Sequence, residues 1–452
     1  VGHRRLFKSR SIPKDRDFFY IYSMKKLLLI AFCGLLINNT LASSGDSIKL
    51  SIKAWKINLF NLDKINEPVD TNLNLFHLYN PVYKKSFSSS YLGNFGLAAK
   101  SNILTFRQQE EDFIFITPYN WYIFNPKKIV YFNTTKPYSD ISYTSNFFSG
   151  SDAKEQSISV LHSQNINPNL NIGLNYRLIS SMGQYDNQIT RNYALNFFSS
   201  FNHRRYDAYF NFNMNKISVQ HNGGIADDSF ITDSSDIKPS EIPINFETDV
   251  NSVIYDRHLY FAQELKLVKT LRPAVEDNNL PVDSLLQADS LIKTDTLMPA
   301  DSIMPFDSTR MDTAHEKNND KDTVQADSGK TNIPAVDKYN LSLVHFFSYK
   351  KNYHAYYDDF NDSTAFYPDV YFANSPDSQY YRSLRNSIGA RFLLPVLRLR
   401  GLFYFTNELQ KYYFMSFSDG INIMNNYVSA ELATYQSPRW NYNFSANYCL
   451  NG

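Results

Sequence analysis

The chain has 452 residues, of which 43% are hydrophobic, 16% aromatic and 20% charged, and its formal net charge is +1. This near-neutral balance argues against a nucleic-acid partner, because polyanion binding requires an excess of basic side chains. The mean hydropathy of -0.40 is that of a soluble protein. It does not exclude a transmembrane β-barrel, in which half of each strand faces lipid and half faces water.

Residues 24–42 have the pattern of a secretory signal peptide. Met24 and two lysines precede an apolar run from Leu27 to Ile37, and small residues stand before the expected cleavage site after Ala42. The run is too short to cross a membrane as a helix, and the alternative is a buried N-terminal helix. No other long apolar stretch follows, which argues against a helical membrane protein.

The segments on either side of this signal are less regular. Residues 1–23 carry many basic groups without periodicity, and we interpret them as translated upstream sequence. After removal of the signal only Cys449 remains, so no disulfide is expected within the mature chain. Residues 43–139 are aromatic and extended, with a glycine-punctuated turn at Tyr91–Gly96. We expect them to form a periplasmic segment or a plug in the lumen of a barrel.

The clearest structural signal is the alternation from Arg205 to Asn215. The even positions from Tyr206 to Met214 are apolar or aromatic, whereas the odd positions are polar apart from Tyr209. A period of two gives two distinct faces only on a β-strand. The eleven residues match the about 9 to 11 that a tilted strand needs to cross a bilayer.

The same alternation recurs along the chain and favours an all-β fold, an antiparallel transmembrane β-barrel. The 33 tyrosines and 35 phenylalanines suit aromatic girdles at the two membrane interfaces. We assign the barrel strands to residues 140–270 and 337–452. The individual strands are predicted at 141–148, 156–163, 170–180, 191–201, 205–219, 252–268, 338–348, 383–394, 397–406, 426–435 and 439–449.

Residues 271–336 differ in composition from the strands. Asp-Ser or Asp-Thr recurs in a stretch rich in Asp, Pro, Lys and Asn, which cannot bury enough apolar surface to become ordered. The repeat also resembles the Asp-Ser/Thr-aliphatic acceptor of O-glycosylation in Bacteroidota, and the alternative is a drifting repeat without modification. The candidate acceptors are Ser284, Ser290, Thr296, Ser302, Thr313 and Thr323.

The C-terminus lacks the aromatic-ended final strand that is usual in bacterial barrels. The chain ends at Asn451 and Gly452, shortly after a predicted strand. We therefore expect a truncated chain with an incomplete barrel, whose full strand number the sequence does not give. Unpaired strand edges are energetically unfavourable in lipid, so the part of the barrel missing from this chain would be needed to satisfy them.

No pattern in the sequence predicts catalysis, and we expect neither an enzyme nor a cofactor. A Gly-x-Ser-x-Gly elbow and a glycine-rich phosphate loop are both missing from the sequence. The nine histidines are scattered without metal-ligand spacing. Asn222-Gly223-Gly224 is interpreted as a loop turn with positive φ angles.

The polar positions of the strands predict the lining of a pore. If the aromatic residues face lipid, the polar ones face an enclosed aqueous lumen, and acidic and basic groups across it would favour small polar solutes. The alternative is that these groups hydrogen-bond one another and fill a narrow barrel. The candidate lining residues are Asn175, Arg177, Arg205, Asp207, Asn211, Asn213, Arg398, Arg400, Ser429, Glu431, Asn441 and Asn443.

A series of short stretches resembles the putative porin family of Bacteroidota outer membranes. The order and spacing of the stretches match the family from about residue 90 onward, apart from the insertion and the early end. The matching stretches are Tyr91–Ala99, Lys136–Tyr143, Glu155-Gln156, His162–Pro168, Gly183–Gln188, Asn222–Ile225, Tyr356–Asp359 and Asn386–Ile388.

The resemblance implies an outer-membrane β-barrel that acts as a passive diffusion channel for small polar solutes. It implies outer-membrane lipid and the barrel assembly machinery as partners and supplies no catalytic residues. Further copies of the chain are also candidate partners, since porins often form oligomers. Two alternatives remain open: a receptor or adhesin barrel without an open pore, and a secreted soluble sandwich or propeller with the aromatic face turned inward.

Overall fold

The structure is a computed structural model of the chain. Two compact units divide it, Val1–Ser51 and Ile52–Gly452, and every element named below belongs to the second unit. The predicted signal peptide, the 271–336 insertion and all six candidate glycosylation residues lie outside the described residues. The structure describes residues 51–69, 77–146, 154–232, 237–246, 250–269, 339–358, 377–394, 397–414, 420–434 and 442–451.

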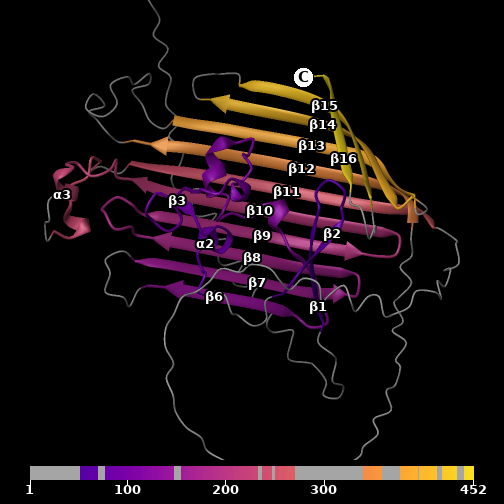
Figure 1. The fold of residues 1–452 in the computed structure, drawn as a ribbon, viewed down its shortest axis with the longest axis horizontal. Coiled ribbons are helices and arrows are strands. Elements are labelled where there is room, and N and C mark those ends of the chain that lie inside the picture. Colours follow the sequence, from indigo (N-terminus) through magenta and orange to yellow (C-terminus); the bar gives the residue numbers. More distant parts are fainter. Residues whose placement is uncertain are drawn as a thin grey trace, which may run out of the picture. The chain divides into compact units, whose positions relative to one another are not determined.

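One antiparallel sheet of eleven strands dominates the second unit (Figure 1). Its strands pair in chain order, so each strand is hydrogen-bonded to the one before and after it, and β6 and β16 form the two edges of the described sheet. The strands are β6 (Tyr138–Ser145), β7 (Glu155–Asn167), β8 (Leu170–Ser181), β9 (Thr190–Asn202), β10 (Tyr206–His221), β11 (Val250–Lys269), β12 (Tyr339–Tyr357), β13 (Asp377–Leu394), β14 (Leu399–Phe414), β15 (Ile421–Thr434) and β16 (Asn443–Asn451).

The eleven strands confirm the predicted antiparallel all-β fold class, and each corresponds to one predicted strand. The differences lie at the ends. β12 continues nine residues beyond the predicted 338–348. The prediction ended too early because the second half of the strand is rich in Tyr and Lys and does not alternate between apolar and polar residues. A single sheet of eleven strands also differs from a propeller, which is built of four-stranded blades, and from a sandwich whose strands are shared between two large sheets.

The connections between strands divide the sheet into two rims. The turns after β7, β9 and β13 are short and lie at one rim, which we call the short-turn rim; the β11–β12 connection, which contains the insertion, leaves from the same rim. The connections after β8, β10, β12 and β14 are longer and lie at the opposite rim, the long-loop rim. In the turn after β10, Gly223 and Gly224 have φ angles of 68° and 88°, which confirms the predicted positive-φ turn.

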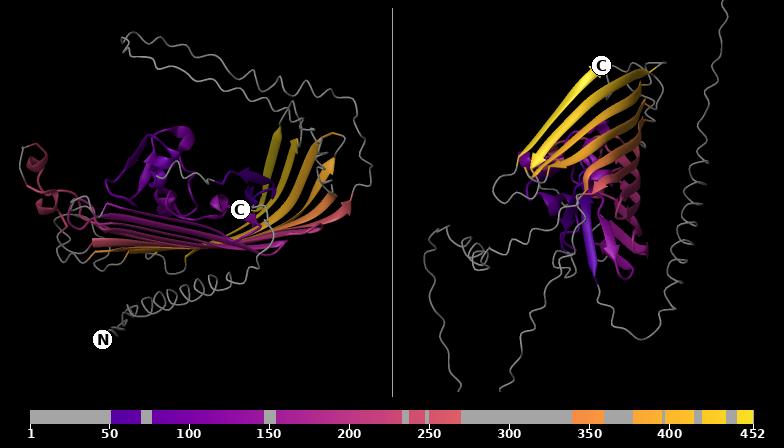
Figure 2. Two further views of the ribbon diagram at one scale, coloured as in Figure 1. Left: turned by 90° about the horizontal axis from the view of Figure 1, so that it is seen from below. Right: turned by 90° about the vertical axis from the view of Figure 1, so that its right-hand side faces the viewer.

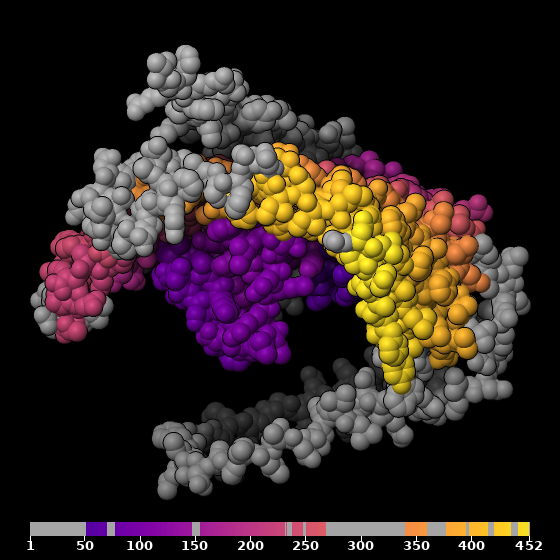
Figure 3. All heavy atoms as spheres, turned by 90° about the horizontal axis from the view of Figure 1, so that it is seen from above, coloured from indigo at the N-terminus to yellow at the C-terminus, as the bar shows by residue number. Residues whose placement is uncertain are grey.

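Residues 52–69 and 77–134, which we call the inner segment, pack against one face of this sheet. Figures 2 and 3 show them nested on the concave side of the curved sheet. Three of its strands form a small sheet in the order β2–β1–β5, and β3 pairs with β4. Its elements are β1 (Ile52–Ile57), β2 (Lys64–Glu67), α2 (Pro81–Lys85), β3 (Ser89–Tyr91), β4 (Ala99–Ser101), η1 (Leu104–Phe106), η2 (Ile114–Tyr119), η3 (Pro126–Lys128) and β5 (Tyr131–Thr134). Beyond β10, the short elements α3 (Ser229–Thr232) and η4 (Pro239–Glu241) belong to the long-loop rim.

Two hydrophobic clusters hold the inner segment against the sheet. In one, Trp55 and Tyr131 pack with Phe198, Tyr209 and Phe346 of the sheet. In the other, residues of the inner segment from Val82 to Ile123 pack with Ile179, Ile217, Val219 and Ile254 of the sheet. At these positions the inward face of the sheet is therefore apolar or aromatic. Burial of apolar surface drives the docking of the inner segment.

Candidate functional site

The face of the sheet that contacts the inner segment is the candidate functional site, and we call it the inward face. Along β10 every second residue is buried on this face. Asn211 and Asn213 are fully buried, whereas Phe210 and Phe212 point to the opposite, outward face and are only partly buried. The alternation seen in the sequence therefore separates these two pairs of residues as expected.

A track of hydrogen-bonded amides crosses the inward face from β8 to the inner segment. Asn175 Nδ2 donates to Asn196 Oδ1 at 3.0 Å, and Asn196 Nδ2 donates to Asn213 Oδ1 at 2.8 Å. Asn213 Nδ2 donates to Asn211 Oδ1 at 2.9 Å, and Asn211 Nδ2 donates to the hydroxyl of Tyr131 at 2.9 Å. Asn196, Asn213 and Asn211 each both donate and accept, so the track satisfies polar groups that water does not reach.

An ionic cluster links the β1–β2 hairpin of the inner segment to strands β11, β13, β14 and β15 of the sheet. Asp63 accepts from Arg391 at 3.3 Å and is also bonded to Arg400. Arg391 reaches Glu264 at 3.2 Å, and Arg400 reaches Glu431 at 2.9 Å. Both Arg400 and Glu431 have side chains that are only 8% exposed. The cluster thus joins three carboxylates and two guanidinium groups in a largely buried site.

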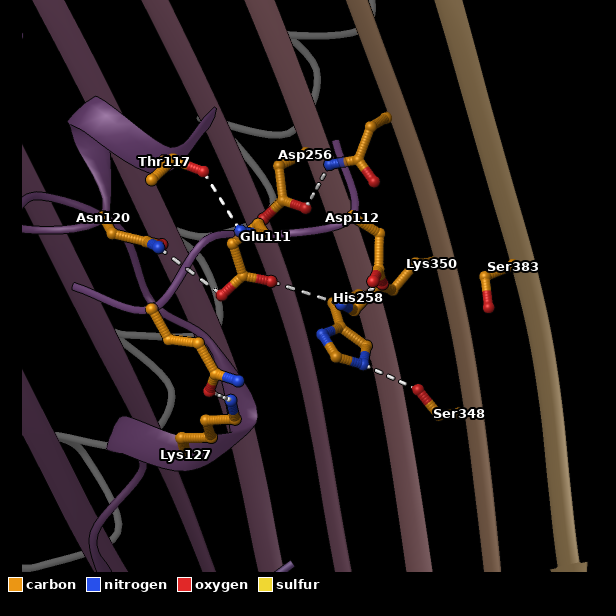
Figure 4. A network of polar contacts seen from close by, with 12 residues as sticks. Glu111, Asp112, Thr117, Asn120, Lys127, Asp256, His258, Ser348, Lys350 and Ser383 are labelled. Carbon is orange, nitrogen blue, oxygen red and sulfur yellow. Dashed lines mark hydrogen bonds and ion pairs between the residues drawn. The ribbon is translucent and has the colours of Figure 1, made fainter. Parts of the chain in front are cut away.

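A second polar cluster lies beneath η2, between the inner segment and β11–β12 (Figure 4). Lys350 Nζ lies 3.3 Å from carboxylate oxygens of Glu111 and Asp112 of the inner segment. The buried carboxylate of Asp256 accepts from Asn215 and from Asn352, both at 2.7 Å. A cavity of about 20 Å³ adjoins Asp256 and Lys350, which is room for one water molecule.

The glycine-punctuated turn predicted at Tyr91–Gly96 is a third docking point. The side chain of Asn94 is 1% exposed and donates to the backbone carbonyl of Gln188 at 2.6 Å. Asn192 Nδ2 donates to the carbonyl of Gly96 at 2.8 Å. Gly96 has a φ angle of 94°, and a Cβ atom there would lie 2.8 Å from Asn192 Nδ2 and 3.0 Å from Thr190 Cγ2. Only glycine fits this close approach to the sheet.

Replacement of Gly96 with alanine is expected to destabilise the docked conformation of this turn by about 2 kcal/mol. The φ angle is unfavourable for alanine, and the new methyl group would clash with the sheet. Gly93→Ala is the matched control: its φ angle is 84°, but its nearest neighbour would be 4.0 Å away. Proteolysis within the inner segment measures the effect. Equal cleavage rates for the two variants would show that contact with the sheet does not restrain Gly96.

Lys128, in η3, combines burial with nearby positive charge. Burial lowers the pKa of Lys128 to about 7, and the charges of Lys85 and Arg177 act in the same direction. Its Nζ donates to the backbone carbonyls of Asn120 and Ile123. The ammonium form is therefore less favourable in the docked inner segment than in water.

We expect the docking of the inner segment to depend on pH. The pKa of Lys128 in water is near 10.5, so between about pH 7 and 10.5 only the undocked segment holds the proton, and docking weakens as the pH falls through this range. Below about pH 7 both states hold the proton and the effect is constant. Hydrogen exchange of the inner segment at pH 7 and pH 9, corrected for the intrinsic exchange rate, measures this. Lys128→Met should abolish the difference, whereas Lys127→Met, at an exposed position, should retain it.

The structure brings together some of the candidate pore-lining residues and separates others. The buried set on the inward face comprises Asp207, Asn211, Asn213, Arg400, Ser429 and Glu431. Asn175 and Arg177 are half-buried on the same face, and the guanidinium of Arg177 lies 5.1 Å from the ring centre of Phe124. These side chains contact protein in the structure, so their role as the lining of an aqueous pore stays a prediction.

The other four candidates lie elsewhere. Arg205 and Arg398 are exposed in turns of the short-turn rim, and Arg398 has a φ angle of 51°. The strand predicted to begin at residue 397 begins instead at Leu399, so the parity argument does not apply to Arg398. Asn443 is exposed on the edge strand β16, and Asn441 lies outside the described residues.

Several polar residues of the site were missed by the sequence analysis. Asn196 follows the same alternation in β9 as Asn211 does in β10, so parity could have identified it. Asp63 and Asn94 gave no such signal, because each belongs to an irregular turn and finds its partners in strands far along the chain.

A cavity of about 300 Å³ lies beside the ionic cluster. It is lined by Asn58, Asp63, Arg400, Tyr442 and Asn443, among others. In the described part of the chain, no group of three His, Cys, Asp or Glu side chains is placed to hold a metal ion. No helix within the described ranges is both long enough and apolar enough to span a membrane.

The profile of one protein family, described as "Putative porin", matches residues 51–452. The chain belongs to this family. The match includes the inner segment as well as the sheet, so this porin-family chain shares both parts of the described unit with its family. A comparison with curated proteins gives no match.

Proposed function

We propose that this porin-family chain forms a β-barrel wall in the outer membrane and admits small polar solutes by passive diffusion. The observation that supports it best is the contrast between the two faces of the sheet. On β14, Phe403 and Phe405 of the outward face are 53% and 40% exposed, whereas Thr406 and Glu408 of the inward face are 4% and 2% exposed. Exposed apolar side chains on the outward face and polar side chains on the inward face, here beside the apolar positions that hold the inner segment, are what a water-containing barrel in lipid requires.

In this proposal the inner segment is a plug-like lining that narrows the lumen. Its ionic cluster, its amide track and its hydrophobic contacts fix it to the inward face. The cavity beside Asp63 and Arg400 is lined by polar and charged groups, which suits polar solutes better than apolar ones.

Heat-modifiable migration of detergent-extracted protein, together with conductance in a planar bilayer, tests the proposal. We expect a fast-migrating folded form and discrete conductance steps. Recovery of the full-length protein entirely in a soluble fraction would refute the membrane assignment.

A receptor or adhesin barrel without an open pore is the second candidate. The full burial of Asn211 and Asn213 beneath the inner segment favours it, because these positions have no contact with water. A heat-modifiable protein that gives no conductance steps would support this second function over a channel.

A further inference from the structure

The outward face carries a row of aromatic residues near the long-loop rim. In the strand register Tyr255 lies opposite Tyr353, Tyr353 opposite Tyr380, and Tyr380 opposite Tyr413. Lys216 of β10 continues the row next to Tyr255, with Nζ 5.2 Å from the centre of that ring. The four tyrosines therefore span β11 to β14 without interruption, and Lys216 extends the row to β10.

A row of four cations lies directly beside these tyrosines, one step further from the long-loop rim. Arg257 lies opposite Lys351, Lys351 opposite Arg382, and Arg382 opposite Lys411. Lys351 Nζ and Arg382 Cζ lie 5.6 and 5.7 Å from the ring centre of Tyr380. Alternation of side chains places all four on the outward face, which we call the cation row.

The outward face provides no counter-charge for the cation row. The described outward positions of β10 to β14 include no Asp or Glu, and the carboxylates of these strands, such as Asp256, Glu264 and Glu408, lie on the inward face. The cation row forms no ion pair with any described residue. Like charges directly opposite one another destabilise a sheet, so an anion bound to the outward face would stabilise the row.

The position of the cation row matches the edge of a hydrocarbon layer. On β12, Lys351 lies ten positions along the strand from Leu341, and both are on the outward face. At about 3.4 Å per residue and a tilt of about 40°, this is about 26 Å along the membrane normal, close to the about 25 Å height of an apolar band. The outward residues at the levels in between include Leu343 of β12, which is 47% exposed, and Leu384 of β13, opposite Tyr349, which is 37% exposed.

Some polar side chains also occur inside this band, but they are paired with one another. Asn407 donates to Asn426 at 2.7 Å, and Gln263 and His345 are hydrogen-bonded at 3.0 Å. Such pairing reduces the cost of exposing amides to lipid. Among the described outward positions of β10 to β14, by contrast, the cations lie in the two rows next to the long-loop rim, the level at which we place the headgroups.

We infer that the cation row binds the phosphate groups of a phosphorylated lipid headgroup in the leaflet at the long-loop rim. This inference rests on the proposed membrane barrel. Arg257 and Arg382 present planar forks that fit phosphate oxygens, and the two lysines add point charges between and beside them. The tyrosine row supplies rings with polar tips suited to the same interfacial level. Four strands at about 4.8 Å spacing give a row about 14 Å wide, enough for several phosphate groups.

Binding of phosphatidic acid in detergent micelles tests the inference. The test variant is Lys351→Gln with Arg382→Gln, and the control is Arg205→Gln with Arg398→Gln, which removes the same charge from exposed turns of the opposite rim. We expect the test variant to bind about thirtyfold more weakly, since each basic side chain near an anionic lipid contributes a factor of about five. The control should bind as the wild type does.

Three outcomes would overturn the inference. These are equal affinity of the test variant and the wild type, equal affinity of the wild type for phosphatidylcholine and phosphatidic acid, and full competition by inorganic phosphate, which would indicate a free-anion site. If the test variant fails to fold, salt dependence of the wild type replaces it: binding unchanged between about 0.05 and 0.5 M salt would also overturn the inference. A wild type that is heat-modifiable and conducts but shows no lipid preference leaves the proposed function intact, whereas a soluble wild type defeats both.

Discussion

Replacement of Arg400 with methionine is expected to destabilise the folded protein by about 3 kcal/mol or more, because a buried carboxylate that loses its cation is strongly unfavourable. Arg400 bridges Asp63 of the inner segment and Glu431 of β15, and the side chain of Glu431 is only 8% exposed. Without Arg400, Arg391 alone would face three carboxylates. Urea unfolding in detergent, followed by heat-modifiable migration, measures the change.

Two further variants separate charge balance from docking. Asp63→Asn leaves two guanidinium groups opposite two carboxylates, Glu264 and Glu431, so it should change global stability by less than about 1 kcal/mol. It removes the ionic contact of the β1–β2 hairpin with the sheet, however, and should increase conductance if the inner segment narrows the lumen. Lys56→Met, in a pair with Glu67 whose side chains are 33% and 29% exposed, is the surface control. An Arg400→Met protein as stable as the Lys56→Met protein would contradict a buried ionic cluster.

The second large effect is expected at the end of the amide track. Asn211→Leu should cost about 2 to 3 kcal/mol, because it leaves the buried hydroxyl of Tyr131 without its donor and leaves Asn213 Nδ2 with only the longer, 3.4 Å bond to the carbonyl of His258. Tyr131→Phe removes the hydroxyl to which Asn211 donates and should lower the free energy of unfolding by about 1 kcal/mol. Tyr131 is fully buried, so water does not replace the lost partner.

A double-mutant cycle shows whether these two residues act together. The Tyr131→Phe, Asn211→Leu protein should be more stable than the sum of the single effects predicts, since neither substituted residue then leaves the other unpaired. The free energy of unfolding in urea is the measurement. Strict additivity of the two single effects would show that the hydrogen bond between β5 and β10 contributes little.

The fold class and the strands followed from local sequence. The alternation between Arg205 and Asn215 depends only on the period of the strand backbone, which neighbouring residues determine by themselves. For the same reason the positive φ angles of Gly223 and Gly224 were predictable, because turn chemistry is local. Arg398 was misplaced because parity was extended by one residue into a turn, where alternation no longer applies.

The candidate site was predictable only in part. Parity identified Asn211, Arg400 and Glu431 as inward-facing, but it did not show that protein would cover them. The partner of Asn211 is Tyr131, 80 residues earlier, and the partner of Arg400 is Asp63, 337 residues earlier. No local pattern encodes such distances.

The sequence by itself determined that this chain forms long amphipathic β-strands, because a period of two is a property of the backbone. Only the tertiary structure decided what lies against each face. Docking of the inner segment buried the inward face, and the strand register aligned Arg257, Lys351, Arg382 and Lys411 into one row. Register depends on pairing between strands that are distant in sequence, and a shift by one residue would turn every side chain to the other face.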